Sequence, residues 1–279
     1  MQKSLLFFLI MITGISSFAQ KQMACCSPSS ANQFASLAND KDFVMAHDAP
    51  LPFIYHSING NDITFKTADG TDAHGWMVKA SKPTNYYIFV IHEWWGLNDY
   101  IKQQTEKLSN ELGVNAIAID LYDNKVATTP EEAGKLIQAV KPERAMNIIK
   151  GAFTYAGSNA KVFTIGWCFG GGWSLQTAIA GGSQVLGCVM YYGMPETDVD
   201  KLKTLHCDVI GFFGNKDKWI TPKVVEDFKA NMKAADKNLT TYEYDADHAF
   251  ANPSSANNNK EAAADAYVKT ITFIKERMK

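Results

Sequence analysis

Short apolar runs alternate with longer amphipathic stretches along most of the chain, which is the pattern of strands interleaved with helices. The apolar runs predict strands at residues 62–66, 75–79, 86–91, 114–119, 161–165, 185–191, 209–213 and 240–244. Apolar positions at helical spacing predict helices at residues 100–112, 130–140, 143–155, 171–180, 222–235 and 260–277.

The order of these elements predicts how the sheet is built. The first strands follow one another without helices, so we expect them to be antiparallel. The later strands alternate with helices, which favours a parallel sheet covered on both faces. The sequence therefore predicts an α/β-hydrolase fold with about eight mostly parallel strands.

The first 19 residues have the order of a secretory signal peptide: a positive charge at Lys3, an apolar run over residues 4–15, and small residues up to Ala19. The apolar run is short for a membrane span, so an uncleaved anchor is the weaker alternative. We expect cleavage near Ala19 and an exported chain, periplasmic or secreted. No later stretch is long and apolar enough for stable membrane insertion.

Residues 20–50 are polar, with a helix-like patch at 33–46 that Pro50 and Pro52 end, and they predict an N-terminal extension. Residues 51–279 have the length of one large α/β domain with a single hydrophobic core. Without residues 1–19 the chain keeps 26 basic and 29 acidic residues, which are scattered. This charge favours neither nucleic acid nor anionic membrane as a partner.

Five cysteines remain after signal removal, and an odd number in an exported protein leaves at least one thiol unpaired. Cys188 and Cys207 lie in or beside apolar runs, which predicts buried thiols. Cys25 and Cys26 are adjacent, and a vicinal disulfide, a disulfide to elsewhere, two free thiols and a lipid anchor on Cys25 are all compatible with the sequence.

Cys168 lies between a predicted strand and a predicted helix, in the sequence GWCFGGG at residues 166–172. This is the nucleophile-elbow pattern with cysteine in the place of serine. Glycines two positions before and after Cys168 permit the sharp turn. A helix N-terminus favours a thiolate and offers N–H groups to an oxyanion. The alternatives are a buried structural cysteine and, more weakly, a phosphate-binding glycine loop, which lacks its following Gly-Lys-Ser/Thr.

A cysteine nucleophile needs a base and a group that orients the base. Asp217 and His248 each follow a predicted strand, in the chain order nucleophile, acid, histidine that this fold uses. His92 is the alternative base, and Asp245 or Asp247 the alternative acid. The remaining histidines, His47, His56, His74 and His206, have no such placement. Histidines and acids are nowhere spaced like metal ligands, so neither a metal nor a cofactor is expected.

Glu93 follows the strand at residues 86–91 in the sequence HEWWG, within the loop that donates an oxyanion N–H in this fold. A carboxylate beside the thiol can keep that thiol protonated until substrate displaces it. The alternative is a buried structural carboxylate.

Four motifs together resemble the dienelactone hydrolase family over residues 50–279. They are HEWWG at 92–96, GWCFGG at 166–171, GNKD at 214–217 and DHAF at 247–250. The resemblance implies an α/β-hydrolase fold, a cofactor-free triad of Cys168, His248 and Asp217, and a glutamate that contacts the resting cysteine. It also implies an oxyanion hole made by the backbone N–H groups of Trp94 and Phe169.

The chain departs from the dienelactone-cleaving members where they place an arginine after the histidine motif to hold the substrate carboxylate. Asn252 stands there and cannot form a charged bidentate clamp. Four tryptophans near the motifs suggest an aromatic-lined pocket: Trp94, Trp95, Trp167 and Trp219. We therefore expect a cysteine hydrolase for a small, apolar or aromatic ester or lactone. A catalytically silent ligand-binding protein with the same fold is the alternative.

Overall fold

The computed structural model describes residues 30–279. The signal peptide predicted at residues 1–19 and the cysteines Cys25 and Cys26 lie outside the described residues. Within residues 30–279, no helix is both long enough and apolar enough to cross a bilayer.

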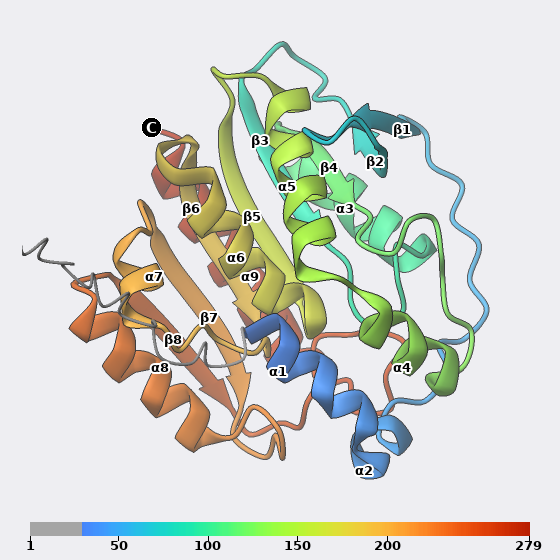
Figure 1. The fold of residues 1–279 in the computed structure, drawn as a ribbon, viewed down its shortest axis with the longest axis vertical. Coiled ribbons are helices and arrows are strands. Elements are labelled where there is room, and N and C mark those ends of the chain that lie inside the picture. Colours follow the sequence, from blue (N-terminus) through green and yellow to red (C-terminus); the bar gives the residue numbers. More distant parts are fainter. Residues whose placement is uncertain (1–29) are drawn as a thin grey trace, which may run out of the picture.

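Eight strands form a single sheet among the described residues, in the spatial order β1-β2-β4-β3-β5-β6-β7-β8 (Figure 1). Every strand predicted from the sequence is present. Their bounds are β1 Gly60–Lys66, β2 Asp72–Val78, β3 Tyr86–Ile91, β4 Asn115–Ile119, β5 Lys161–Trp167, β6 Val185–Tyr191, β7 Asp208–Gly214 and β8 Leu239–Tyr244. β2 is antiparallel to both of its neighbours, and all other pairs are parallel.

The expectation that the early strands are all antiparallel is wrong for β3. Although no helix separates it from β2, the chain passes beyond the position of β4 and places β3 beside β5. There β3 pairs in parallel with β4 and β5. The crossover helix between β3 and β4 is α3, Asp99–Leu112, so this pair obeys the ordinary rule for parallel strands.

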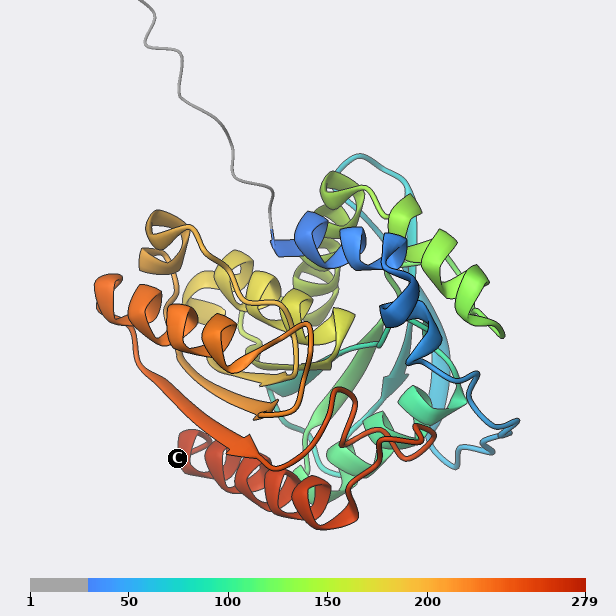
Figure 2. The same ribbon diagram turned by 90° about the horizontal axis from the view of Figure 1, so that it is seen from below.

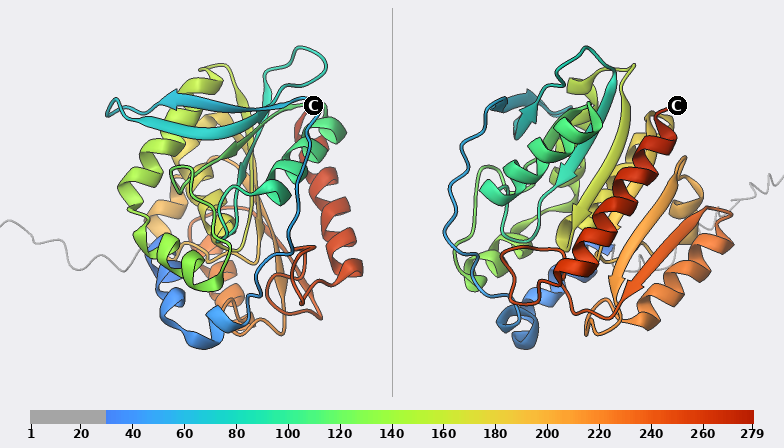
Figure 3. Two further views of the ribbon diagram at one scale, coloured as in Figure 1. Left: turned by 90° about the vertical axis from the view of Figure 1, so that its right-hand side faces the viewer. Right: turned by 180° about the vertical axis from the view of Figure 1, so that it is seen from behind.

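Helices cover both faces of the sheet, as predicted. α3 and α9 cover one face, and α4 to α8 lie on the other, together with α1 and α2 (Figures 2 and 3). The remaining bounds are α1 Ser30–Ser36, α2 Lys41–Met45, α4 Pro130–Ala139, α5 Pro142–Ala156, α6 Phe169–Gly181, α7 Val199–Lys203, α8 Pro222–Ala234 and α9 Lys260–Arg277.

Burial on both faces explains why the central strands consist of unbroken apolar runs. The side chains of Ile88, Phe89, Val90 and Ile91 in β3 are all fully buried. Such strands lack the alternation of a half-exposed sheet, which is typical of parallel sheets between helix layers. The carboxyl ends of β3, β5, β7 and β8 lead into the loops that carry the candidate site residues.

The helix-like patch predicted at residues 33–46 is not one helix. It consists of α1, the short 3₁₀ helix Leu37–Asn39 and α2. Asp40 breaks the helix because its carboxylate accepts hydrogen bonds from the N–H groups of Asp42 and Phe43 and so caps α2. The short helix α7 was not predicted, since five residues carry too little periodicity to be recognised.

The segment of α1 and α2 packs over the carboxyl ends of the central strands. Phe43 is fully buried there and makes edge-to-face contacts with Trp94 and Trp219, with ring centroids 5.5 and 5.1 Å apart. The indole N–H of Trp219 donates to Asp40 at 3.1 Å. This segment therefore covers the edge of the sheet where α/β enzymes build their sites.

Candidate active site

Cys168 stands on a strained turn between β5 and α6. Its backbone has φ +56° and ψ −120°, a conformation that non-glycine residues rarely adopt. The turn is tight enough that a Cβ on Gly166 would lie 2.0 Å from the carbonyl oxygen of Gly170. The N–H of Cys168 donates to the carbonyl of Tyr191 at 3.0 Å, which ties the turn to β6. The sequence motif thus folds as the sharp strand-to-helix turn predicted for it.

His248 and Asp217 meet at the same edge of the sheet. Asp217 follows β7, His248 follows β8, and His248 Nδ1 donates to Asp217 Oδ2 at 2.6 Å. The other carboxylate oxygen accepts the N–H groups of Trp219 and Ile220, both at 2.9 Å. These bonds hold the carboxylate rigidly and leave Nε2 of His248 free to act as an acceptor.

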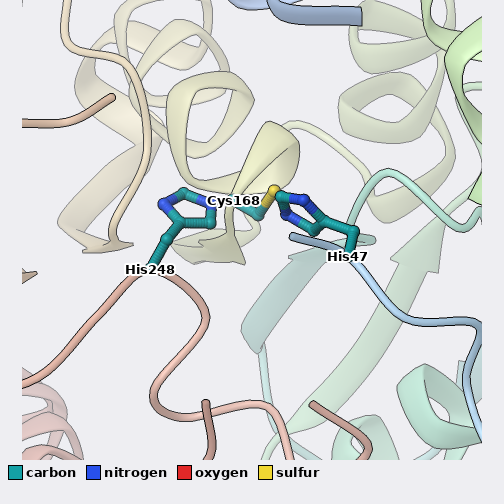
Figure 4. A group of neighbouring side chains, drawn as sticks. All are labelled: His47, Cys168 and His248. Carbon is teal, nitrogen blue, oxygen red and sulfur yellow. The ribbon is translucent and has the colours of Figure 1, made fainter. Parts of the chain in front are cut away.

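Cys168 and His248 face each other in a dry environment, and both are at least 98% buried (Figure 4). Burial raises the pKa of the Cys168 thiol, although the positive charge of His248 opposes this shift. Burial alone would lower the pKa of His248, but the negative charges of Asp217 and of the Cys168 thiolate raise it well above the usual value. The resting site therefore holds a protonated thiol beside a histidine that is readily charged.

Glu93 lies in the same small pocket as Cys168. One carboxylate oxygen accepts from the hydroxyl of Tyr192 at 3.4 Å, and the other accepts from the side-chain amide of Asn252. Burial raises the pKa of Glu93 to about 7, against the opposing influence of His248, Tyr192 and Asn252. Its negative charge in turn contributes to the raised pKa of Cys168. Asn252, which stands where dienelactone-cleaving members place an arginine, thus contacts Glu93 through its side-chain amide.

This raised pKa makes stability depend on pH. A carboxyl group whose pKa is higher in the folded chain costs stability as pH rises from its unfolded value, about 4.5, to about 7. Because Gln carries no charge, Glu93→Gln should gain stability relative to wild type between pH 4.5 and pH 8, by about 3 kcal/mol. Urea unfolding at the two pH values measures this.

The exposed Glu131→Gln variant is the control and should show no such gain. If the free energies of unfolding of wild type and Glu93→Gln differed by the same amount at both pH values, the result would contradict a raised pKa for Glu93.

His47 lies in the site, contrary to the expectation that it has no functional placement. It follows α2, its Nδ1 contacts the carbonyl of Phe43 at 2.7 Å, and its ring is 4.5 Å from that of Trp94. Burial, and then the positive charge of His248, lower the pKa of His47 to about 3. His47 is therefore neutral. No motif marks this residue, because packing of the N-terminal segment brings it to the sheet edge.

The alternative residues are engaged elsewhere. His92 is buried, with Nδ1 at 2.6 Å from the carbonyl of Glu93 and Nε2 accepting the N–H of Leu121. Asp245 and Asp247 are exposed, and Asp245 pairs with Lys216 at 3.0 Å. None of the three replaces a member of the group formed by Cys168, His248 and Asp217.

Both predicted oxyanion donors are near the thiol. Phe169 begins α6 directly after Cys168, and its backbone N–H acts to lower the pKa of the Cys168 thiol. Trp94 follows β3 and lines the same pocket as Cys168, together with Trp95. The other two tryptophans pack outside the lining, since Trp167 stacks on Tyr191 and Trp219 packs on Phe43.

Comparison with known families decides the classification. A model of the dienelactone hydrolase family matches residues 74–278, most of the chain. This chain belongs to the dienelactone hydrolase family. It is therefore a hydrolase that acts on ester bonds, lactones included.

Individual relatives agree with this family. A carboxymethylenebutenolidase of Pseudomonas putida is 26% identical over 231 residues, 76% of this chain and 94% of the relative. Two crystal structures share the fold. One is a dienelactone hydrolase-like promiscuous phosphotriesterase from metagenomic libraries (TM-score 0.67, 19% identity, 78% of this chain and 99% of the other). The other is a dienelactone hydrolase of Anabaena variabilis (TM-score 0.59, 16% identity, 80% and 99%).

Proposed function

We propose that this chain hydrolyses a small ester or lactone with Cys168 as nucleophile, His248 as base and Asp217 as the group that orients the base. The observation that carries the proposal is the strained Cys168 elbow facing a histidine whose other nitrogen is fixed on a buried carboxylate. This arrangement supplies both nucleophile and base in a deeply buried site.

The residues perform the reaction in two halves. In the first, Nε2 of His248 takes the thiol proton, the sulfur attacks the carbonyl carbon, and the proton passes to the leaving alkoxide as a thioester forms. In the second, water gives a proton to His248 and attacks the thioester, and the proton returns to the Cys168 sulfur as the acid leaves. The N–H groups of Phe169 and Trp94 stabilise the oxyanion in both halves.

Glu93 and Asn252 set conditions for this chemistry. When Glu93 carries its negative charge, it disfavours the thiolate form of Cys168. The resting thiol therefore stays protonated and is protected from oxidation until substrate binds. Asn252 is neutral and is already engaged with Glu93. It therefore leaves no positive charge at this position for a substrate carboxylate, which favours uncharged substrates.

The free space at the thiol also favours small substrates. The pocket lined by Cys168, Glu93 and Trp94 holds about one water molecule. His47 lines this pocket as well, so a substrate must displace it or neighbouring residues in order to reach the sulfur. Short acyl groups require the least displacement.

A substrate panel tests the proposal. We expect p-nitrophenyl acetate and small neutral lactones to be hydrolysed with kcat/KM at least tenfold higher than p-nitrophenyl octanoate and an anionic dienelactone. Faster cleavage of the dienelactone than of neutral lactones would overturn the preference for uncharged substrates.

If residues 1–19 direct export, the enzyme recovered from the exported fraction should have the mass of a chain that lacks them.

A further inference from the structure

A third side chain of metal-binding type lies beside the nucleophile and its base. Cys168 Sγ and one ring nitrogen each of His47 and His248 all lie within 4.8 Å of one another. The two imidazole rings approach the sulfur from opposite sides (Figure 4). All three side chains are at least 92% buried. A hydrolytic triad requires only one of these histidines.

The two histidines are held in the same way. His248 Nδ1 is fixed on Asp217 at 2.6 Å, and His47 Nδ1 on the carbonyl of Phe43 at 2.7 Å. In both rings Nε2 is buried; that of His47 has no hydrogen-bond partner among the described residues, and that of His248 faces the Cys168 thiol. An imidazole whose Nδ1–H is bound to an oxygen presents a bare Nε2 lone pair, which is the usual state of a metal-ligating histidine. A buried acceptor without a donor, as His47 Nε2 is, costs stability unless a ligand pairs with it.

The donor set suits zinc. One thiolate sulfur and two imidazole nitrogens are ligands that Zn²⁺ prefers, and Zn–S and Zn–N bonds of about 2.3 and 2.0 Å place tetrahedral ligand atoms about 3.3–3.6 Å apart. The three side chains would need to approach by about 1 Å. The thiolate and the Asp217 carboxylate balance the two positive charges. His47 and Cys168 line the same small pocket as Glu93, and its room for about one water molecule allows water as the fourth ligand.

We propose that Cys168, His248 and His47 form a zinc site that reversibly blocks the nucleophile. On binding, the S–H bond breaks, a Zn–S bond forms and the proton passes to solvent. The sulfur then shares its lone pair of electrons with the metal. Because His248 Nε2 is also bound to the metal, it can no longer accept a proton, so attack on a carbonyl stops. Metal binding stands on the geometry alone, whereas its inhibitory effect rests on the proposed hydrolase function.

His47 distinguishes this site from one that contains only the pair Cys168 and His248. It precedes residues 74–278, which match the dienelactone hydrolase family. The N-terminal segment, and with it Phe43, holds the ring in place. Without His47 only two ligands remain, which is too few for a tight zinc site.

Binding is tested on the reduced, metal-free protein. Because Cys25 and Cys26 supply two further thiols, both are first replaced by serine, and this chain is the reference. Isothermal titration with Zn²⁺ gives stoichiometry and affinity, and Co²⁺ as a substitute reports a sulfur ligand through its thiolate charge-transfer absorption. His47→Ala, His47→Gln and Cys168→Ala are compared with the controls His206→Ala and Cys207→Ala, and thermal unfolding in chelator confirms that each folds.

We expect one Zn²⁺ per reference chain, affinity at least about 100-fold lower in both His47 variants, no charge-transfer band in Cys168→Ala, and unchanged binding in the controls. Unchanged affinity in a folded His47 variant, or a band that persists without Cys168, would overturn the site. Esterase assays in the same samples form the second arm. Zinc binding in a chain without esterase activity would uphold the metal site and contradict the proposed hydrolase, whereas zinc binding to an active chain without inhibition would overturn the blocking role.

Discussion

Cys168→Ala should lower kcat for p-nitrophenyl acetate by at least about 10⁴-fold, because it removes the atom that forms the thioester. The fold should survive, since alanine fits the site of a cysteine and the elbow is held by the backbone bond to Tyr191 and by the glycines at its flanks. Any residual rate would come from binding and from the oxyanion donors alone.

The matched control is Cys188→Ala, a thiol that is also fully buried and free but lies in β6, away from His248. It should retain the wild-type rate apart from a stability loss measured separately. If Cys168→Ala, like Cys188→Ala, kept a rate within tenfold of wild type, Cys168 would be excluded as the nucleophile.

Asp217→Asn should have the second largest effect, a loss in kcat of about 10³–10⁴-fold. An amide at this position can donate to Nδ1 of His248 and so select the wrong tautomer, with the proton on Nε2. It also removes the negative charge that raises the pKa of His248. Steady-state kinetics from pH 5 to 9 should show low kcat throughout, with KM little changed, because Asp217 does not line the pocket.

Asp245→Asn is the control for this variant. Asp245 precedes the same histidine but is exposed and pairs with Lys216. A loss of activity in Asp245→Asn equal to that in Asp217→Asn would contradict the assignment of Asp217 as the orienting group.

Much of this architecture could be predicted because its signals are local. Each buried strand is a short apolar run, and the loops after β5, β7 and β8 carry Cys168, Asp217 and His248 in a fixed order. Parallel strands end at one edge of a sheet, so the order alone brings these residues together. The pairing of β3 could not be predicted, because the order of strands across a sheet depends on crossovers that no single segment encodes.

The position of His47 could not be predicted for a different reason. Its three-way contact depends on how Phe43 and its neighbours pack against Trp94 and Trp219, which is tertiary packing without a sequence period. Its ligand partners lie 121 and 201 residues further along the chain, so spacing rules for metal sites do not detect it. The contact between Asn252 and Glu93 is long-range in the same way.

Trapping the covalent intermediate tests the central claim most directly. The protein is mixed with p-nitrophenyl acetate, quenched in acid within milliseconds, digested and analysed by mass spectrometry, with Cys168→Ala alongside. We predict one acetyl group per chain, on the peptide that contains Cys168, appearing before steady state and lost in the variant. An acetyl group on another residue, or turnover with no adduct at any time, would contradict a cysteine nucleophile in this chain.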